Sequence, residues 1–145
     1  MMNNWFLVKV SYEKMMENGF QKKVTEQYLI DALSFAEAEA RGIEELRPLI
    51  TGEFTVSAVG RARINEVFFN ESGDRYYKAK LHFITLDEKT GMEKKSPVTM
   101  MAQASNIKDA ISVIEEGLKG TMADYEIASV AETPIMDVFE YKVKD

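Results

Sequence analysis

The chain repeats a spaced pattern of apolar residues at an interval of 71 positions, and this repeat constrains its fold more than any other feature. Residues 56–69 read VSAVGRARINEVFF, and residues 127–140 read IASVAETPIMDVFE. Four apolar residues of the first segment recur 71 positions later, with Val59, Ile64, Val67 and Phe68 matched by Val130, Ile135, Val138 and Phe139. Order and spacing kept over several positions indicate that one structural unit is used twice.

The correspondence extends beyond this pair of segments. Trp5 and Lys9 match Tyr76 and Lys80 at the same interval, and the turn-like stretch NGFQKKV matches TGMEKKS. Further along, YLIDALSFAEA is matched by MMAQASNIKDA, with a slippage of one residue. The repeat therefore covers strand-like, turn-like and helix-like stretches in the same order.

Each repeat predicts two strands and then a helix. WFLVKVSY alternates in hydrophobicity, as a half-buried strand does, and an Asn-Gly pair after it predicts a hairpin turn. Ser34, followed three residues later by Glu37, forms a capping box that predicts a helix at roughly 35–48. Asn106 occupies the matching place before a second helix at roughly 107–119. We expect the first residues of these helices, Phe35 and Ile107, to be buried.

A closing strand completes each repeat, bent near Gly60 in the first and near Pro134 in the second. The predicted fold is α+β, with two tandem ββαβ repeats at residues 4–70 and 75–141 in a single domain of residues 1–145. A unit of about 70 residues with one helix cannot cover both faces of its own sheet. We therefore expect the two units to pack about a pseudo-two-fold axis, with mostly antiparallel sheet and the helices on one face.

Composition limits the possible functions. The chain of 145 residues is 46% hydrophobic and 29% charged, which fits a globular domain with a core. It has no apolar run of about 18 residues, no recognisable signal peptide and no cysteine, so we expect a cytoplasmic protein. His82 is its one histidine, and a metal site is therefore not expected. No phosphate-binding loop or catalytic signature is recognisable, so we predict no cofactor and no enzymatic activity.

Strand alternation separates the two faces of the predicted sheet. If Phe6 and Val8 face the helix, their neighbours face away from it. This reasoning places a set of basic and aromatic side chains on the face without helices: Trp5, Lys9, Lys23, Tyr76, Lys78, Lys80 and Lys95. The helices instead carry mostly glutamate and aspartate. The net charge of −6 is then the sum of an acidic helical side and a basic sheet side.

An open sheet face with lysines and aromatic rings suits single-stranded nucleic acid, because bases stack on rings and lysines neutralise phosphates. Other interpretations remain open. Trp5 and Tyr76 could cover a sheet edge or a dimer interface, and lysines on exposed strands protect edges from aggregation. The leading hypothesis is a non-enzymatic protein that binds single-stranded nucleic acid without sequence preference. The alternative is a homodimeric protein–protein interaction module with no nucleic-acid ligand.

One basic pair distinguishes the two repeats. Arg61 and Arg63 lie near the bend of the first closing strand, where the second repeat has Glu132 and Pro134. If one repeat contacts an anion, this difference favours the first, and both arginines join the candidate nucleic-acid-binding residues. The alternative is a salt bridge between the arginines and their acidic counterpart.

Four blocks of the sequence carry a family resemblance: WFLVKVSYEK, KKVTEQYLIDALSFAEAEAR, YYKAKLHFITLDEKTGMEKK and GTMADYEIASVAETPIMDVFEY. Over nearly its full length the chain resembles an uncharacterised domain-of-unknown-function family of gut Bacteroidetes and their phages. The resemblance implies no catalytic residues. It favours a phage or mobile-element setting, and with it either an accessory protein of DNA metabolism or a small inhibitor of a host defence protein.

Overall fold

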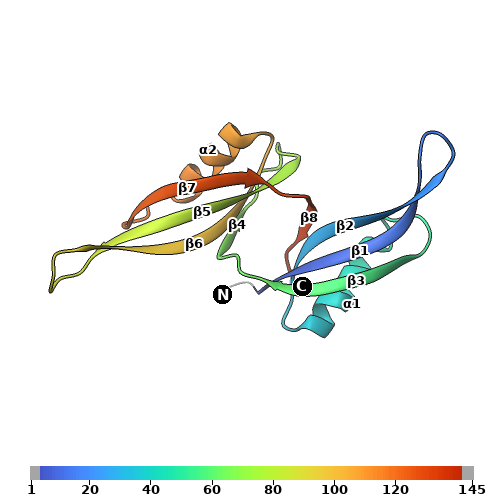
Figure 1. The fold of residues 1–145 in the computed structure, drawn as a ribbon, viewed down its shortest axis with the longest axis horizontal. Coiled ribbons are helices and arrows are strands. Elements are labelled where there is room, and N and C mark those ends of the chain that lie inside the picture. Colours follow the sequence, from blue (N-terminus) through green and yellow to red (C-terminus); the bar gives the residue numbers. More distant parts are fainter. Residues whose placement is uncertain (1–3, 142–145) are drawn as a thin grey trace, which may run out of the picture. The chain divides into compact units, whose positions relative to one another are not determined.

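The computed structural model describes residues 4–141 and shows an α+β fold with two helices and two mostly antiparallel, four-stranded sheets (Figure 1). In chain order the elements are β1 (Trp5–Met15), β2 (Gln21–Asp31), α1 (Phe35–Leu46), β3 (Phe54–Ala62), β4 (Glu66–Phe68), β5 (Arg75–Leu86), β6 (Glu93–Ala104), α2 (Ile107–Gly117), β7 (Asp124–Glu132) and β8 (Ile135–Phe139). The chain divides into two compact units. Unit 1 comprises the described residues up to Arg63 together with those from Pro134 onward, and unit 2 comprises Ile64–Thr133.

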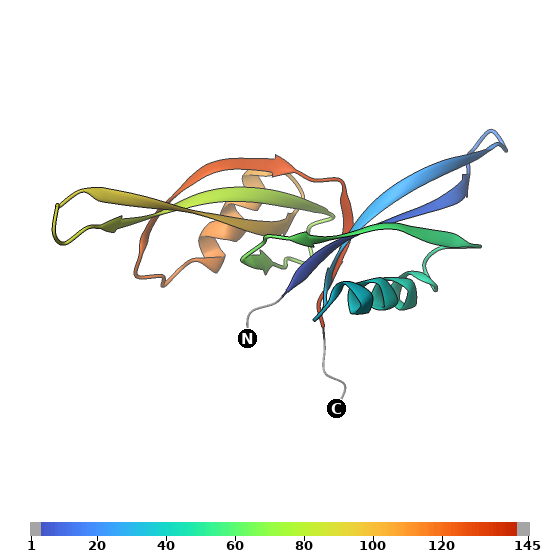
Figure 2. The same ribbon diagram turned by 60° about the horizontal axis from the view of Figure 1, so that its bottom comes forward.

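Each unit consists of one sheet with one helix against a single face of it (Figure 2). The strand order is β3-β1-β2-β8 in unit 1 and β4-β6-β5-β7 in unit 2. The long antiparallel hairpins β1–β2 and β5–β6 form the centre of the two sheets. The strands thus form two separate sheets rather than one continuous sheet.

The cores follow from the period-two alternation of the central strands. In unit 1, Phe6, Val8 and Val10 of β1 lie on the same face as Tyr28 and Ile30 of β2, and α1 covers them. In unit 2, α2 covers the corresponding face of β5 and β6, and the buried residues there are Tyr77, Ala79, Leu81, Met100, Ala102, Ala104, Ala110, Ile114 and Leu118. The inward positions predicted for β1 are therefore confirmed.

Both helices begin where their capping residues predict. The Ser34 hydroxyl accepts a hydrogen bond of 3.1 Å from the backbone N–H of Glu37. The Asn106 side-chain oxygen accepts one of 2.8 Å from the backbone N–H of Asp109. These bonds satisfy amide groups that a helix start leaves without an intrahelical partner.

Within the described part of the chain, neither helix is both long and apolar enough to cross a bilayer.

The first residue of each helix is more exposed than expected. Phe35 and Ile107 are each about half exposed, so the prediction that they are buried is wrong. A residue at the start of a helix precedes the turn that lies over the sheet, and its side chain reaches only the margin of the core. The Phe35 ring accordingly contacts the Phe6 ring edge-on, with 5.1 Å between the ring centroids.

The closing segments also differ from the prediction. Each was expected to be one bent strand, but residues 56–69 divide into β3 and β4, and residues 127–140 divide into β7 and β8. β4 pairs in parallel with β6 in unit 2, and β8 pairs in parallel with β2 in unit 1. Pro134 has no N–H to donate and lies at the second break. Each sheet is thus completed by a short strand from the other half of the sequence.

Both central hairpins extend beyond the strands that flank them (Figure 2). β3 pairs with β1 only as far as Tyr12, and β8 pairs with β2 only over Gln27–Ile30. β7 likewise pairs with β5 no further than Ile84. The outer end of each hairpin is therefore a two-stranded ribbon with a tight turn.

Candidate functional site

The two aromatic side chains expected on an open sheet face are buried. Trp5 is 2% exposed and Tyr76 is 4% exposed, so the prediction that they form an accessible stacking platform is wrong. Both lie on the face of their sheet opposite the helix, as alternation predicts, but that face is not open at these positions. Leu29 and Met101 on the same faces are also fully buried. In the sequence, Leu29 and Met101 are apolar residues at positions that alternation places away from the helix. They could have indicated that these sheet faces are partly covered.

The lysines of this predicted set differ in accessibility and in partners. Lys78 and Lys80 of β5 are exposed, as is Lys23 of β2, whereas Lys9 of β1 is half-buried. Among the described residues, none of these three exposed lysines forms an ion pair, and Lys78 and Lys80 are neighbours on one strand. They lie two positions apart on one strand and therefore project from the same face. These two are the cations of the set best placed to meet an anionic partner.

Lys95 belongs to a small charged cluster on the same face of unit 2. Its ammonium lies 2.8 Å from the Glu126 carboxylate, and Nδ1 of His82 lies 3.2 Å from the same oxygen. The hydrogen bond with Glu126 raises the pKa of Lys95, and the bonds from Lys95 and then His82 lower the pKa of Glu126. The Glu126 carboxylate already compensates the charge of Lys95. A phosphate group would have to compete with this carboxylate for the Lys95 ammonium.

Within unit 1, Arg61 lies on the face of the sheet opposite the one that carries Lys9 and Lys23. Arg61 lies directly opposite Phe6 in the β1–β3 ladder, and its guanidinium carbon is 5.4 Å from the centroid of the Phe6 ring. This cation–π contact places Arg61 on the helix face of its sheet. Arg63 is exposed in the connector that follows β3. The carboxylate of Glu132, the expected salt-bridge partner, lies instead 3.3 Å from Arg75.

The outer ends of the two hairpins carry exposed apolar side chains that were not among the predicted site residues. Phe20 is 73% exposed at the β1–β2 end, beside Met15 and Met16. At the β5–β6 end, Leu86 and Met92 are each 68% exposed. Turns are normally polar, so apolar residues next to the glycines of two turns were the signal that could have revealed these ends. We call the two sets the hairpin ends.

Hydrogen bonds fix the backbone of the first hairpin end. The N–H of Met16 donates to the carbonyl of Phe20 at 2.8 Å, and the N–H of Gly19 donates to the carbonyl of Met16 at 2.9 Å. The Asn18 side chain accepts a further bond of 3.1 Å from the N–H of Phe20. Gly19 has a φ of 85°, which a residue without a side chain adopts readily. The exposed phenyl ring is therefore presented from an ordered turn.

The second hairpin end is built in a similar way around an aspartate. The Asp87 carboxylate accepts a bond of 2.9 Å from the N–H of Lys89, and the Asp87 N–H donates to the Met92 carbonyl at 2.9 Å. Gly91 has a φ of 70° and donates to the Asp87 carbonyl at 2.7 Å. Asp87 thus caps the turn that holds Leu86 and Met92.

Comparison with known families gives a match along almost the whole chain. The model of a domain of unknown function, DUF4494, matches residues 4–141. The chain belongs to the DUF4494 family. The matched span takes in both sheets and both helices, so the DUF4494 domain comprises the two units together. A search of curated proteins finds no match to this DUF4494 chain.

The described surface of this DUF4494 domain offers two kinds of contact. The hairpin ends present apolar side chains, and the face of unit 2 opposite α2 presents two exposed lysines without ion-pair partners in the described residues. Within residues 4–141, no three His, Asp or Glu side chains gather closely enough to hold a metal ion. The candidate functional surfaces of the described residues are therefore these two contact surfaces.

Proposed function

We propose that this DUF4494 protein is a non-enzymatic binding protein that docks onto another protein through its hairpin ends. The observation that carries the proposal is the exposure of Phe20, Leu86 and Met92 in hydrogen-bonded turns. Exposed apolar clusters on ordered backbone are typical of protein interaction sites. Burying one such side chain contributes about 1.5–3 kcal/mol, and a preformed turn loses little conformational entropy on binding.

In this proposal the two units arose by duplication, and each unit carries one hairpin end. The strand orders β3-β1-β2-β8 and β7-β5-β6-β4 match when each strand is compared with its counterpart in the other half, which supports the duplication. The family resemblance to proteins of gut Bacteroidetes and their phages favours a cytoplasmic partner in the host, such as a defence protein. Homodimerisation through the hairpin ends is the simplest form that the same contact can take.

Replacing Phe20 and Leu86 together by serine should abolish partner binding while leaving the fold intact, because both side chains are exposed. We expect the recovery of the partner with a tagged full chain to fall at least tenfold, since about 1.4 kcal/mol corresponds to a factor of ten. Quantitative mass spectrometry of the co-purified proteins measures the loss, and light scattering of the purified chain measures any loss of dimer.

The matched control for this double variant is Met122→Ser. Met122 is 99% exposed but lies outside both hairpin ends, in the segment before β7. It should recover the same partner, or form the same dimer, as the wild-type chain does. Equal recovery of every protein by the wild type, the double variant and the control, with no dimer in any of them, would overturn the proposal.

A second candidate function is binding of single-stranded nucleic acid, and Lys78 and Lys80 favour it. Both are exposed on one face of β5, where Lys80 pairs with Thr99 of β6 and Lys78 pairs with Met101. Because Trp5 and Tyr76 are buried, the contact would be with phosphates rather than with stacked bases. Such binding is weak and falls steeply with salt concentration.

Replacing Lys78 and Lys80 by alanine should reduce the salt dependence of oligonucleotide binding. Each lost phosphate contact lowers the slope of log affinity against log salt by about 0.7 for a single strand, so the pair lowers it by about 1.4. Fluorescence anisotropy with a labelled oligothymidine measures the slope. The control pair Lys108→Ala and Lys119→Ala removes the same charge near α2. No binding at low salt, or an equal effect of the control, would exclude this candidate.

A further inference from the structure

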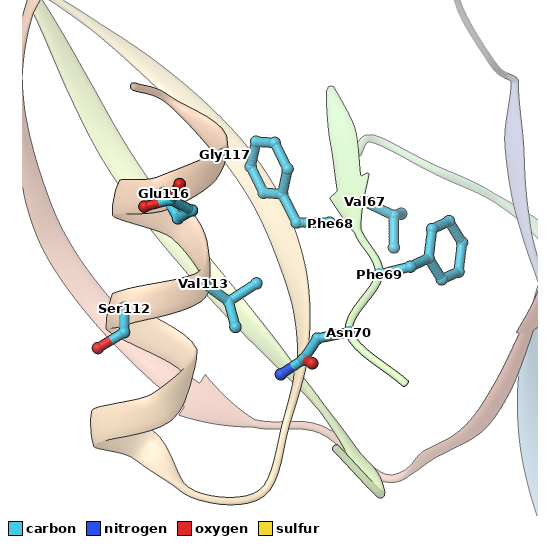
Figure 3. A pocket seen from close by; sticks show the side chains of 8 residues that line it. All are labelled: Val67, Phe68, Phe69, Asn70, Ser112, Val113, Glu116 and Gly117. Carbon is cyan, nitrogen blue, oxygen red and sulfur yellow. The ribbon is translucent and has the colours of Figure 1, made fainter. Parts of the chain in front are cut away.

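A groove of about 570 Å³ lies between α2 and β4, within unit 2 and separate from the hairpin ends. Figure 3 shows Val113 of α2 and Phe68 of β4 pointing toward each other, whereas Val67 and Phe69 point to the other side of β4. The lining residues are Val67, Phe68, Phe69, Asn70, Ser112, Val113, Glu116 and Gly117. Most of this lining is apolar, and among the described residues that form it Glu116 alone is charged.

At the end of the groove drawn uppermost in Figure 3, Gly117 of α2 leaves room for the Phe68 ring. A Cβ atom at Gly117 would come within 2.5 Å of the Phe68 ring, so the ring occupies the space of the absent side chain. Phe68 packs in this way against α2 and against the core of unit 2. The apolar floor of the groove is therefore held in place by the core and needs no rearrangement to receive a side chain.

The lower end of the groove is fixed by hydrogen bonds. The N–H of Asn70 donates to the Gln103 side chain at 3.0 Å, and the amide of Gln103 donates to the Gly73 carbonyl at 3.1 Å. The Ser72 hydroxyl donates to the Asn70 side chain at 2.8 Å. These bonds tie the turn after β4 to β6, so the groove is preformed at both ends.

At the matching place in unit 1 the chain itself supplies an aromatic contact. Tyr141 corresponds to Asn70 of the groove at the interval of 71, and Arg41 corresponds to Val113 once the slippage of one residue in the helix is included. The Arg41 guanidinium carbon lies 5.1 Å from the centroid of the Tyr141 ring, so an aromatic residue that follows the edge strand packs against a cation of the helix. Unit 2 has two smaller side chains at these positions. An extended segment with one aromatic ring is thus the kind of occupant that this architecture accommodates.

The backbone beside the groove can receive such a segment. β4 is an edge strand that pairs only with β6. The other edge of β4 carries no strand in the part of the chain that the structure describes. An edge strand offers N–H and C=O groups to an added strand, and neighbouring hollows then select its alternate side chains. β4 and β8 themselves join their sheets as short added strands, so the sheet edges of this fold already accept this kind of pairing.

We propose that the groove between α2 and β4 binds an extended segment of a partner protein that carries an aromatic side chain and a nearby lysine or arginine. The aromatic ring enters the apolar groove between Phe68 and Val113, and the segment pairs with the open edge of β4. The cationic side chain lies beside Glu116, where no cation of residues 4–141 lines the groove. This site is independent of the hairpin ends and of any partner bound there.

Panning a random dodecapeptide library on the immobilised full chain tests the proposal. We expect enrichment of peptides in which an aromatic residue and a lysine or arginine lie within three positions of each other. A synthetic copy of an enriched peptide should bind the Ser112→Arg variant at least tenfold more weakly. The new arginine lies one helical turn from Glu116, pairs with it and fills the groove. The variant Glu116→Lys should weaken binding severalfold, because it removes the carboxylate that attracts the cation and adds a repelling charge.

Two controls keep the outcomes distinct. Glu115→Arg adds the same side chain to α2 outside the groove and should bind the peptide like the wild type. The variant with Phe20→Ser and Leu86→Ser should also bind it normally, which separates this site from the hairpin ends. No enrichment, enrichment of acidic peptides, or unchanged binding by both Ser112→Arg and Glu116→Lys would overturn the proposal.

Discussion

Replacing Val138 by aspartate should unfold unit 1 at a much lower temperature than in the wild-type chain. Val138 lies in β8, is buried and pairs in register with Leu29 of β2. A carboxylate there is buried without a partner and costs about 4 kcal/mol. For a unit of this size such a loss lowers the melting temperature by about 15 °C or more. Trp5 is the only tryptophan of the sequence and lies in unit 1, so its fluorescence follows this transition.

The control for this variant lies on the same strand. Met136 is about half exposed, so Met136→Asp introduces the same charge into β8 without burying it. We expect its melting temperature to stay within a few degrees of the wild-type value. If Val138→Asp and Met136→Asp melted alike, β8 would contribute little to unit 1, and the pairing of β8 with β2 would not stabilise the sheet in solution.

Replacing Gly73 by alanine should be almost as damaging to unit 2. A Cβ atom at this position would lie 2.5 Å from both the Cα and the backbone nitrogen of Ala104. Because these are backbone atoms of β6, they cannot move aside as the end of a flexible side chain can. Relief requires the turn after β4 to move away from the sheet, which costs about 3 kcal/mol. Urea denaturation followed by circular dichroism measures this loss as a lower midpoint.

Gly60→Ala provides the comparison for Gly73→Ala. A Cβ atom at Gly60 meets nothing within 4 Å, and the position lies in the exposed part of β3. The added methyl group should leave the midpoint unchanged or raise it slightly, because alanine loses less conformational entropy on folding. Equal midpoints for the two variants would show that the close approach of Gly73 to β6 is not maintained in solution.

Features of the fold that depend on neighbouring residues could be predicted from the sequence. The Ser34 and Asn106 caps placed both helix starts correctly, and the turn glycines Gly19 and Gly91 placed both hairpins. Alternation predicted which residues of β1 face α1. Each of these features depends on residues within a few positions of one another.

Features that depend on distant residues were not predictable in this way. The divisions between β3 and β4 and between β7 and β8 follow from which strand each segment pairs with, and those partners lie far away in the sequence. The burial of Trp5 depends on what covers its face of the sheet, which alternation alone does not specify. Lys95 was expected to be available for phosphate, but the carboxylate that binds it comes from a different strand.

The hairpin ends could have been found from the sequence, whereas the groove could not. Met15, Met16 and Phe20 surround an Asn-Gly turn, and apolar residues at a turn are visible without a structure. The groove instead arises because α2 and β4 lie side by side, and β4 was not recognisable as a strand of its own. The most informative sequence signal for contact surfaces was therefore an apolar residue where a polar one is normal.

The pairing of β8 with β2 has a consequence for synthesis on the ribosome. Unit 2 is one continuous stretch, Ile64–Thr133, and can fold as soon as that stretch has emerged. The sheet of unit 1 begins to form first, but its last strand is translated only after unit 2 is complete. Until then the edge of β2 is unpaired and open to other chains. Termination of synthesis near Pro134 would therefore release a chain whose earlier-made sheet is the unfinished one.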